Sequence, residues 1–305
     1  MVKAKFSKKG RQMSVQYMLH YAARGQLELV PIELLTPATL LVRDASGSIL
    51  LHWAAEKGQL DYIPNKLFTA INLLVKNSDE FTPLHVAAST GHLDQVPREF
   101  LTEANLLVKD DLGQTPLHFA AEYGHLNQVP REVLTVANLM LKNSDASTPL
   151  HYAAATSHLD QIPRDLLTGA TLVANSASGY TPLHYAAEHG QLDLVPKALL
   201  TEASLMSKNS IGLTPVHYAS EYGHLDQIPM EVLTGINLMV GDNDGMTPLH
   251  CATHQGHLDQ LLGLELLVSS KNIVGNDWWE RNQKVLKAKQ HLVVQDGEHT
   301  GMDIF

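Results

Sequence analysis

The sequence predicts an all-α protein, a solenoid of eight stacked helical repeats of 33 residues with a cap at each end. The first observation is a histidine that recurs at one interval of 32 residues and then six of 33: His20, His52, His85, His118, His151, His184, His217 and His250. The second is the peptide around it, which reads Thr-Pro-Leu-His in five repeats and Thr-Pro-Val-His in a sixth. Self-similarity with a period of about 20 to 50 residues is typical of stacked repeat units.

The Thr-Pro pair predicts where the first helix of each repeat begins. In the fourth repeat Thr115 is a good N-cap, and Pro116 suits the first helical position because its missing N–H would have no partner there. Gly124 ends the helix by tolerating a left-handed φ. The small apolar residues between them predict a face that is buried only when neighbouring repeats stack.

The second half of each repeat contains a proline at a fixed position: Pro31, Pro64, Pro97, Pro130, Pro163, Pro196 and Pro229. Proline disfavours helix in the residue before it, such as Val96. We therefore expect a second helix that begins at the proline and lasts under two turns, as in residues 97–102. A threonine follows in seven repeats and predicts a third helical turn, as in residues 102–107.

The tetrapeptide, followed by small residues and Gly-His-Leu as in residues 87–93, resembles the ankyrin repeat. The resemblance covers about residues 12–274 and implies a binding module rather than an enzyme. It also implies that the tetrapeptide histidine hydrogen-bonds loop backbone between repeats. The sequence has no nucleophile motif, glycine-rich phosphate loop or cysteine pair, so we expect no catalytic residue, cofactor or metal.

The two ends of the chain differ from the repeats. Residues 1–11 form a basic N-terminal segment, residues 12–274 the repeats, and residues 275–305 a capping helix and tail. Asp277 and Glu280 have capping-box spacing, which predicts a helix to about His291. An alternative function is a regulatory subunit or small enzyme that uses the segment after Leu266.

Composition and charge restrict the partner. There is no run of 18 apolar residues and no signal peptide, and the single Cys251 excludes an intramolecular disulfide, so we expect a cytoplasmic monomer. The net charge is −10. Without the five basic residues of the N-terminal segment, the chain has 17 Lys and Arg and 32 Asp and Glu. Duplex nucleic acid would be repelled, and a neutral or basic protein or peptide fits better.

Candidate binding residues are those that vary while the scaffold stays fixed. The residue two before the proline, which we expect at the exposed tip of a turn, is large and apolar in four repeats: Phe81, Tyr180, Leu213 and Met246. The residue after the histidine faces the concave groove and is aromatic at Trp53, Phe119, Tyr152, Tyr185 and Tyr218, and two tyrosines, Tyr123 and Tyr222, lie near the helix end.

Aromatic side chains with interspersed acids on a rigid surface suit a protein or peptide partner, because Tyr and Trp offer large contact areas at little entropic cost. The alternative for the residues after the histidine is burial between neighbouring helices. The sequence predicts an interaction scaffold, including one that acts as a stoichiometric inhibitor.

Overall fold

The computed structural model describes residues 15–257 and residue 260, and within this part the chain forms only helices and loops. The chain divides into two compact units, Met1–Asn138 (unit 1) and Leu139–Phe305 (unit 2). The predicted terminal segments 1–11 and 275–305, with the capping helix, lie outside the described residues. The repeat count of eight and the single uninterrupted stack stay predictions.

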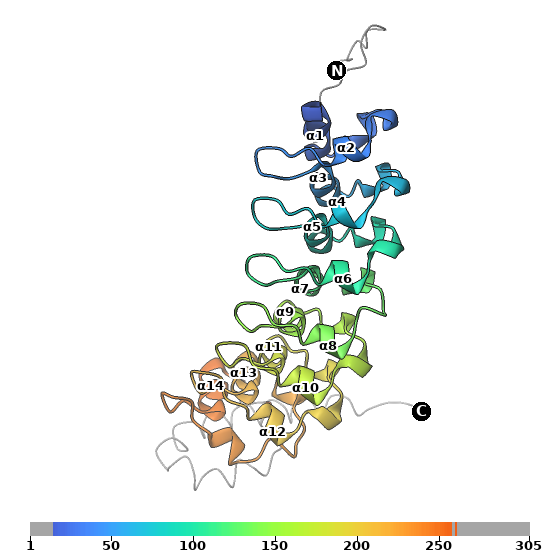
Figure 1. The fold of residues 1–305 in the computed structure, drawn as a ribbon. Helices are drawn as coiled ribbons and strands as arrows, with labels where there is room; N and C mark the ends of the chain where they lie inside the picture. The colour runs from blue at the N-terminus through green and yellow to red at the C-terminus, as the bar shows by residue number, and fades with distance from the viewer. Residues whose placement is uncertain (1–14, 258–259, 261–305) are drawn as a thin grey trace, which may run out of the picture. The chain divides into compact units, whose positions relative to one another are not determined.

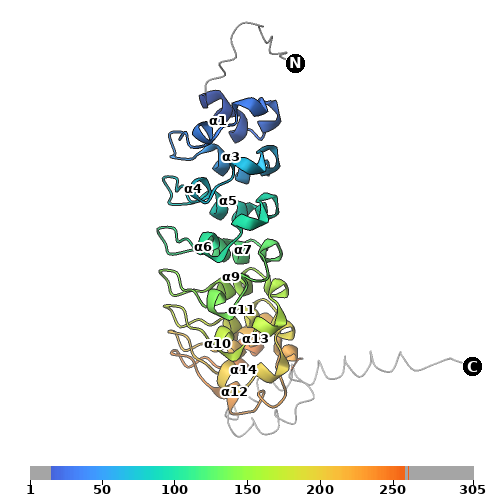
Figure 2. The ribbon, with the colours of Figure 1, turned by 45° about the vertical axis from the view of Figure 1, so that its right-hand side comes forward.

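The first helices of the repeats pack against one another in sequence order within each unit (Figures 1 and 2). In unit 1 they are α1 (Val15–Ala23), α3 (Leu50–Glu56), α5 (Pro83–Thr90) and α7 (Pro116–Glu122). In unit 2 they are α9 (Pro149–Ala155), α11 (Pro182–Glu188), α13 (Pro215–Tyr222) and α14 (Pro248–Gln255). The leucine and the alanine pair of each motif, such as Leu84, Ala87 and Ala88, are fully buried. The core of each unit is therefore a strip between successive helices.

The predicted start and end of the first helix are confirmed. In α5 the Thr82 side chain accepts from the His85 N–H, and Pro83 occupies the first helical position. Gly91 ends the helix with a φ of 76°, and Gly124 has a φ of 75° after α7. Gly91 is required for a second reason, because an added Cβ would lie 2.7 Å from the His125 ring.

The segment after the first helix forms successive 3-10 turns. In unit 1 these are η1 (Leu27–Leu29), η2 (Ile32–Leu34), η3 (Leu60–Tyr62), η4 (Asn65–Leu67), η5 (Leu93–Gln95), η6 (Arg98–Phe100) and η7 (Leu126–Gln128). In unit 2 they are η8 (Leu159–Gln161), η9 (Arg164–Leu166), η10 (Leu192–Leu194), η11 (Lys197–Leu199) and η12 (Leu225–Gln227).

The predicted second helix is as short as expected, under two turns, but it begins one residue after the proline and is a 3-10 turn. Val96 is extended, with φ −83° and ψ 131°, as the preproline restriction requires. Pro97 is also outside the helix, with ψ 130°, and the turn after it ends at Phe100. Because a proline and its neighbour interrupt the segment, a single 3-10 turn forms on each side.

The predicted third helical turn is confirmed. It comprises α2 (Pro37–Leu40), α4 (Ala70–Leu73), α6 (Glu103–Leu106), α8 (Val136–Leu139), α10 (Gly169–Leu172), α12 (Glu202–Leu205) and the 3-10 turn η13 (Asn237–Met239). In α4 the Thr69 hydroxyl caps the Asn72 N–H. The buried Asn72 amide also donates to the Leu67 carbonyl at 2.7 Å, which ties the third helix to the 3-10 turn before it.

A glutamine amide links neighbouring repeats within each unit. Gln128 accepts the Leu93 N–H at 2.9 Å and donates to the Gly91 carbonyl at 2.7 Å. In unit 2, Gln191 accepts the Leu159 N–H at 3.2 Å and donates to the Ala154 carbonyl at 2.7 Å. Each bridge satisfies two backbone groups that the short turns leave open.

Candidate partner-binding surface

The tetrapeptide histidine holds two repeats together through both ring nitrogens. Nδ1 of His184 accepts the Thr181 N–H at 3.0 Å, so the ring proton is on Nε2, which donates to the Leu213 carbonyl at 3.1 Å. His85, His151 and His217 repeat this pair of contacts. The structural role predicted for this histidine, hydrogen bonding to loop backbone between repeats, is confirmed.

Burial fixes these rings in the neutral form. It lowers the pKa of His85, His151 and His184 to about 4, and also lowers the pKa of His52 and His217. A neutral imidazole is required because Nδ1 is an acceptor, and protonation would place a hydrogen between it and the backbone N–H.

The four residues predicted at the tips of turns lie at the base of the loop instead. The Phe81 N–H donates to Asn77 Oδ1 at 3.0 Å, and the Phe81 carbonyl accepts from the Asn77 N–H at 2.9 Å. The His52 ring also donates to this carbonyl at 2.9 Å. The residue therefore closes the loop and is anchored on both sides. The alignment by the histidine assigned these residues to the same position of each repeat. The exposed turn, however, lies one to two residues before that position.

The side chains at this position are exposed to different degrees. Met246 is 42% exposed, whereas Phe81, Tyr180 and Leu213 are half-buried. The Phe81 ring packs edge-on against Phe119, with centroids 5.3 Å apart. The expectation that these four side chains are exposed is thus wrong for three of them, because the loop folds back onto the first helices.

The actual tips of two loops carry apolar side chains that the sequence reasoning missed. Leu112 is 57% exposed and Ile211 is 50% exposed. Each precedes a glycine with positive φ, Gly113 at 74° and Gly212 at 83°. An apolar residue directly before the loop glycine was the available signal.

In two repeats the residue after the histidine contacts the polar residue that opens the loop nine positions earlier. Trp53 Nε1 donates to Asp44 Oδ2 at 2.8 Å, and Asn143 Nδ2 donates to the Tyr152 hydroxyl at 3.0 Å. Trp53, Tyr152 and Tyr185 are half-buried, whereas Phe119 is 9% and Tyr218 is 7% exposed. Burial between helices, the alternative reading, therefore holds for Phe119 and Tyr218.

Asp110 lacks the contact that Asp44 and Asn143 make. It is 7% exposed, and its Oδ2 has no hydrogen-bond partner among the described residues. Burial raises the pKa of this carboxyl. Phe119, nine residues later, has no polar group where Trp53 and Tyr152 have one.

Unit 2 carries a group of tyrosines on adjacent elements. The Tyr180 and Tyr185 rings are stacked, with centroids 5.4 Å apart, and the Tyr218 hydroxyl donates to the Tyr180 hydroxyl at 2.8 Å. Burial, the contact with Tyr180 and the charge of Glu188 raise the pKa of Tyr218. Tyr222 is 47% exposed, as is its unit 1 counterpart Tyr123 at 49%. These two remain the most accessible of the predicted aromatic residues.

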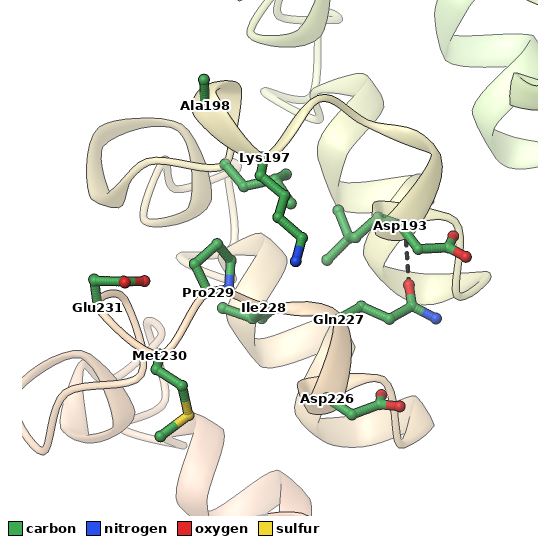
Figure 3. A pocket seen from close by; sticks show the side chains of 11 residues that line it. Asp193, Lys197, Ala198, Asp226, Gln227, Ile228, Pro229, Met230 and Glu231 are labelled. Carbon is green, nitrogen blue, oxygen red and sulfur yellow. Dashed lines mark hydrogen bonds between the residues drawn. The ribbon is translucent and has the colours of Figure 1, made fainter.

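A hollow on the surface of unit 2 lies on the proline segments (Figure 3). It measures ≈ 860 Å³, and Lys197 extends into it near Asp193 and Pro229. A smaller groove of ≈ 440 Å³ lies at the same repeat position in unit 1, beside Asp94 and Pro130. Because the groove recurs with the repeat, it follows from two proline segments lying side by side.

In the part of the chain that the structure describes, no three His, Cys, Asp or Glu side chains converge as metal ligands would. No helix in residues 15–257 has the length and apolar character needed to cross a membrane.

Stacked short helices that present variable side chains on one surface define a repeat-type binding protein. The family of ankyrin repeats (3 copies) matches residues 51–131, 131–202, 165–230 and 190–277. The chain therefore belongs to the ankyrin-repeat family, which generally mediates protein–protein interaction and is typically not enzymatic. A comparison with curated proteins found no match.

Proposed function

We propose that this protein binds a protein or an extended peptide on the surface formed by its first helices and loops. The observation that carries the proposal is an accessible tyrosine in each unit, Tyr123 in unit 1 and Tyr222 in unit 2, each directly after a glutamate at the end of a first helix. Such anchors supply much of the binding energy in protein interfaces. The partner is neutral or basic, since the surface carries an excess of carboxylates.

Each unit also carries an exposed apolar loop tip, Leu112 in unit 1 and Ile211 in unit 2. They are a second reason to expect a macromolecular partner, because an apolar side chain in contact with water gains free energy when a partner covers it. A role as a stoichiometric inhibitor is one form of this function. The alternative, a regulatory or enzymatic use of the segment after Leu266, concerns residues outside the described part.

Selection of a displayed random peptide library on the immobilised full chain tests this proposal. We expect enriched peptides whose affinity falls at least tenfold when Tyr123 and Tyr222 are both changed to Ala. A paired change of Ile71, in α4, and Ile236, directly before η13, is the control; these side chains are 75% and 74% exposed, and their loss should leave affinity unchanged. Failure to enrich any peptide, or equal losses in both variants, would refute the proposed function.

A further inference from the structure

The two central helices of unit 2 bring tyrosines and glutamates to one surface. Tyr185 and Glu188 are three residues apart in α11, and Tyr218, Glu221 and Tyr222 have helical spacings of three and four in α13. Side chains three and four residues apart lie on the same side of a helix. Because α11 and α13 pack together, these residues form one cluster with Tyr180, here named the tyrosine–glutamate cluster.

The aromatic part of this cluster is held in place. The Tyr185 and Tyr180 planes differ by 22°, and the Tyr218 ring lies 6.0 Å from Tyr180 and is hydrogen-bonded to it. Tyr222 is 47% exposed beside this platform. A partner would therefore meet aromatic rings that lose little side-chain entropy on binding.

The two carboxylates lie at the helix ends that favour cations. Glu188 is the last residue of α11 and Glu221 is in the last turn of α13, and neither helix has a basic residue there. The C-terminal end of a helix carries partial negative charge, so a carboxylate there is unfavourable. Among the described residues, neither glutamate has an ion-pair partner within 4.0 Å.

Two loop lysines of unit 2, Lys142 and Lys208, do not neutralise the carboxylates of Glu188 and Glu221. Helices α9, α11, α13 and α14 contain no Lys or Arg. Lys142 and Lys208 lie in the loops, where their Nζ atoms bond the Asn175 and Gly241 carbonyls at 2.7 and 2.6 Å. Among the described residues of unit 2, no Lys or Arg therefore forms an ion pair with Glu188 or Glu221.

We propose that the tyrosine–glutamate cluster binds an arginine side chain of an extended partner segment, an inference that rests on the proposed function. A guanidinium can stack its flat face on the exposed Tyr222 ring while its N–H fork reaches a carboxylate. A lysine ammonium lacks the planar fork and matches this arrangement less well. An apolar segment would remove water from Glu188 and Glu221 without replacing its hydrogen bonds.

Unit 1 offers a matched control for this site. Glu122 and Tyr123 end α7 and repeat the Glu-Tyr pair of α13, with Tyr123 exposed to the same degree as Tyr222. The residue equivalent to Tyr218 is Phe119, whose ring packs on Phe81 and has no hydroxyl. Glu122→Gln therefore removes one negative charge from the same repeat position without altering a tyrosine platform.

The test is a titration of the full chain, isotopically labelled at its nine tyrosines, followed by aromatic NMR. The probes are an acetylated and amidated Gly-Arg-Gly peptide and the same peptide with citrulline, a neutral isostere of arginine. We expect saturable shifts of Tyr185 and Tyr222 signals with the arginine peptide and at least tenfold weaker binding of citrulline. Glu188→Gln should weaken arginine binding at least tenfold, and Glu122→Gln less than twofold.

Equal binding of both peptides, no saturable shift, or equal losses in the two variants would overturn the arginine site. Thermal melts of both variants establish that the fold is kept, and Tyr222→Phe, which retains the ring, should keep most of the binding. If library selection enriches peptides while the arginine titration fails, the proposed function stands and only the arginine site falls. If the selection fails, the proposed function falls independently of this result.

Discussion

At the residue scale, two repeats join the residue after the tetrapeptide histidine to the polar residue that opens the loop. Trp53 Nε1 donates to Asp44, and Asn143 Nδ2 donates to the Tyr152 hydroxyl. At Asp110 this contact is absent, and a carboxylate oxygen is buried without a partner. An unpaired buried acceptor costs free energy, so Asp110 lowers the stability of unit 1.

Phe119→Tyr should repair this position. The new hydroxyl would donate to Asp110 Oδ2, raise the free energy of unfolding by about 1 kcal/mol and lower the pKa of Asp110, which burial now raises. Chemical denaturation and NMR titration of the carboxyl measure the two effects. The same change in an Asp110→Ala background should bring no gain. A loss of stability with an unchanged Asp110 pKa would show that the site has no room for the hydroxyl.

At the element scale, the glutamine bridge explains two sequence variants of the turn. In the Gly-His-Leu repeat at residues 91–93, His92 bonds the Ala55 carbonyl 37 residues earlier, and Gln95, three residues later, accepts the Leu60 N–H of the preceding repeat. In Gly-Gln-Leu the single Gln191 amide makes both contacts. The residue three positions after Gln191 therefore need not be a glutamine, and in this repeat it is Leu194.

This exchange predicts a rescue. Gln128→Leu should lower the free energy of unfolding by about 1 to 3 kcal/mol, because it leaves the Leu93 N–H and the Gly91 carbonyl without the amide. Adding His125→Gln recreates the arrangement of Gln191 and should restore at least half of the loss. Urea denaturation of the single and double variants measures both. A double variant no more stable than Gln128→Leu alone would contradict the exchange.

The first helix and the break before the proline could be predicted from sequence because they depend on single residues. Thr82 and Pro83 begin a helix through their own chemistry, and Val96 is held extended by the proline after it. The 3-10 form of the second helix could not be predicted, since it depends on how Asn72 and its equivalents tie the third turn to the carbonyls before it. The exposure of Phe81 likewise depends on contacts across repeats.

At the scale of the whole molecule, the recurring histidine gives every unit the same sensitivity to acid. Burial lowers the pKa of His85 in unit 1 and of His151 and His184 in unit 2 to about 4. The unfolded chain binds a proton on each ring near pH 6.5, so the unfolded state holds more protons than the native state between these values. Stability is therefore full above pH 6.5 and falls as the pH drops toward 4.

The contribution of one histidine to this pH dependence can be separated from the contributions of all other titrating groups. The linkage makes native His85 lose about 2 kcal/mol of its contribution by pH 5. His85→Gln should be less stable than the wild type at pH 7.5, because it loses contacts to Thr82 and the Gln114 carbonyl. That difference in stability should shrink by about 2 kcal/mol at pH 5, since carboxylate titrations are shared by both proteins and cancel. Denaturation curves at the two pH values decide the matter, and a constant difference would mean that the buried ring does not resist protonation.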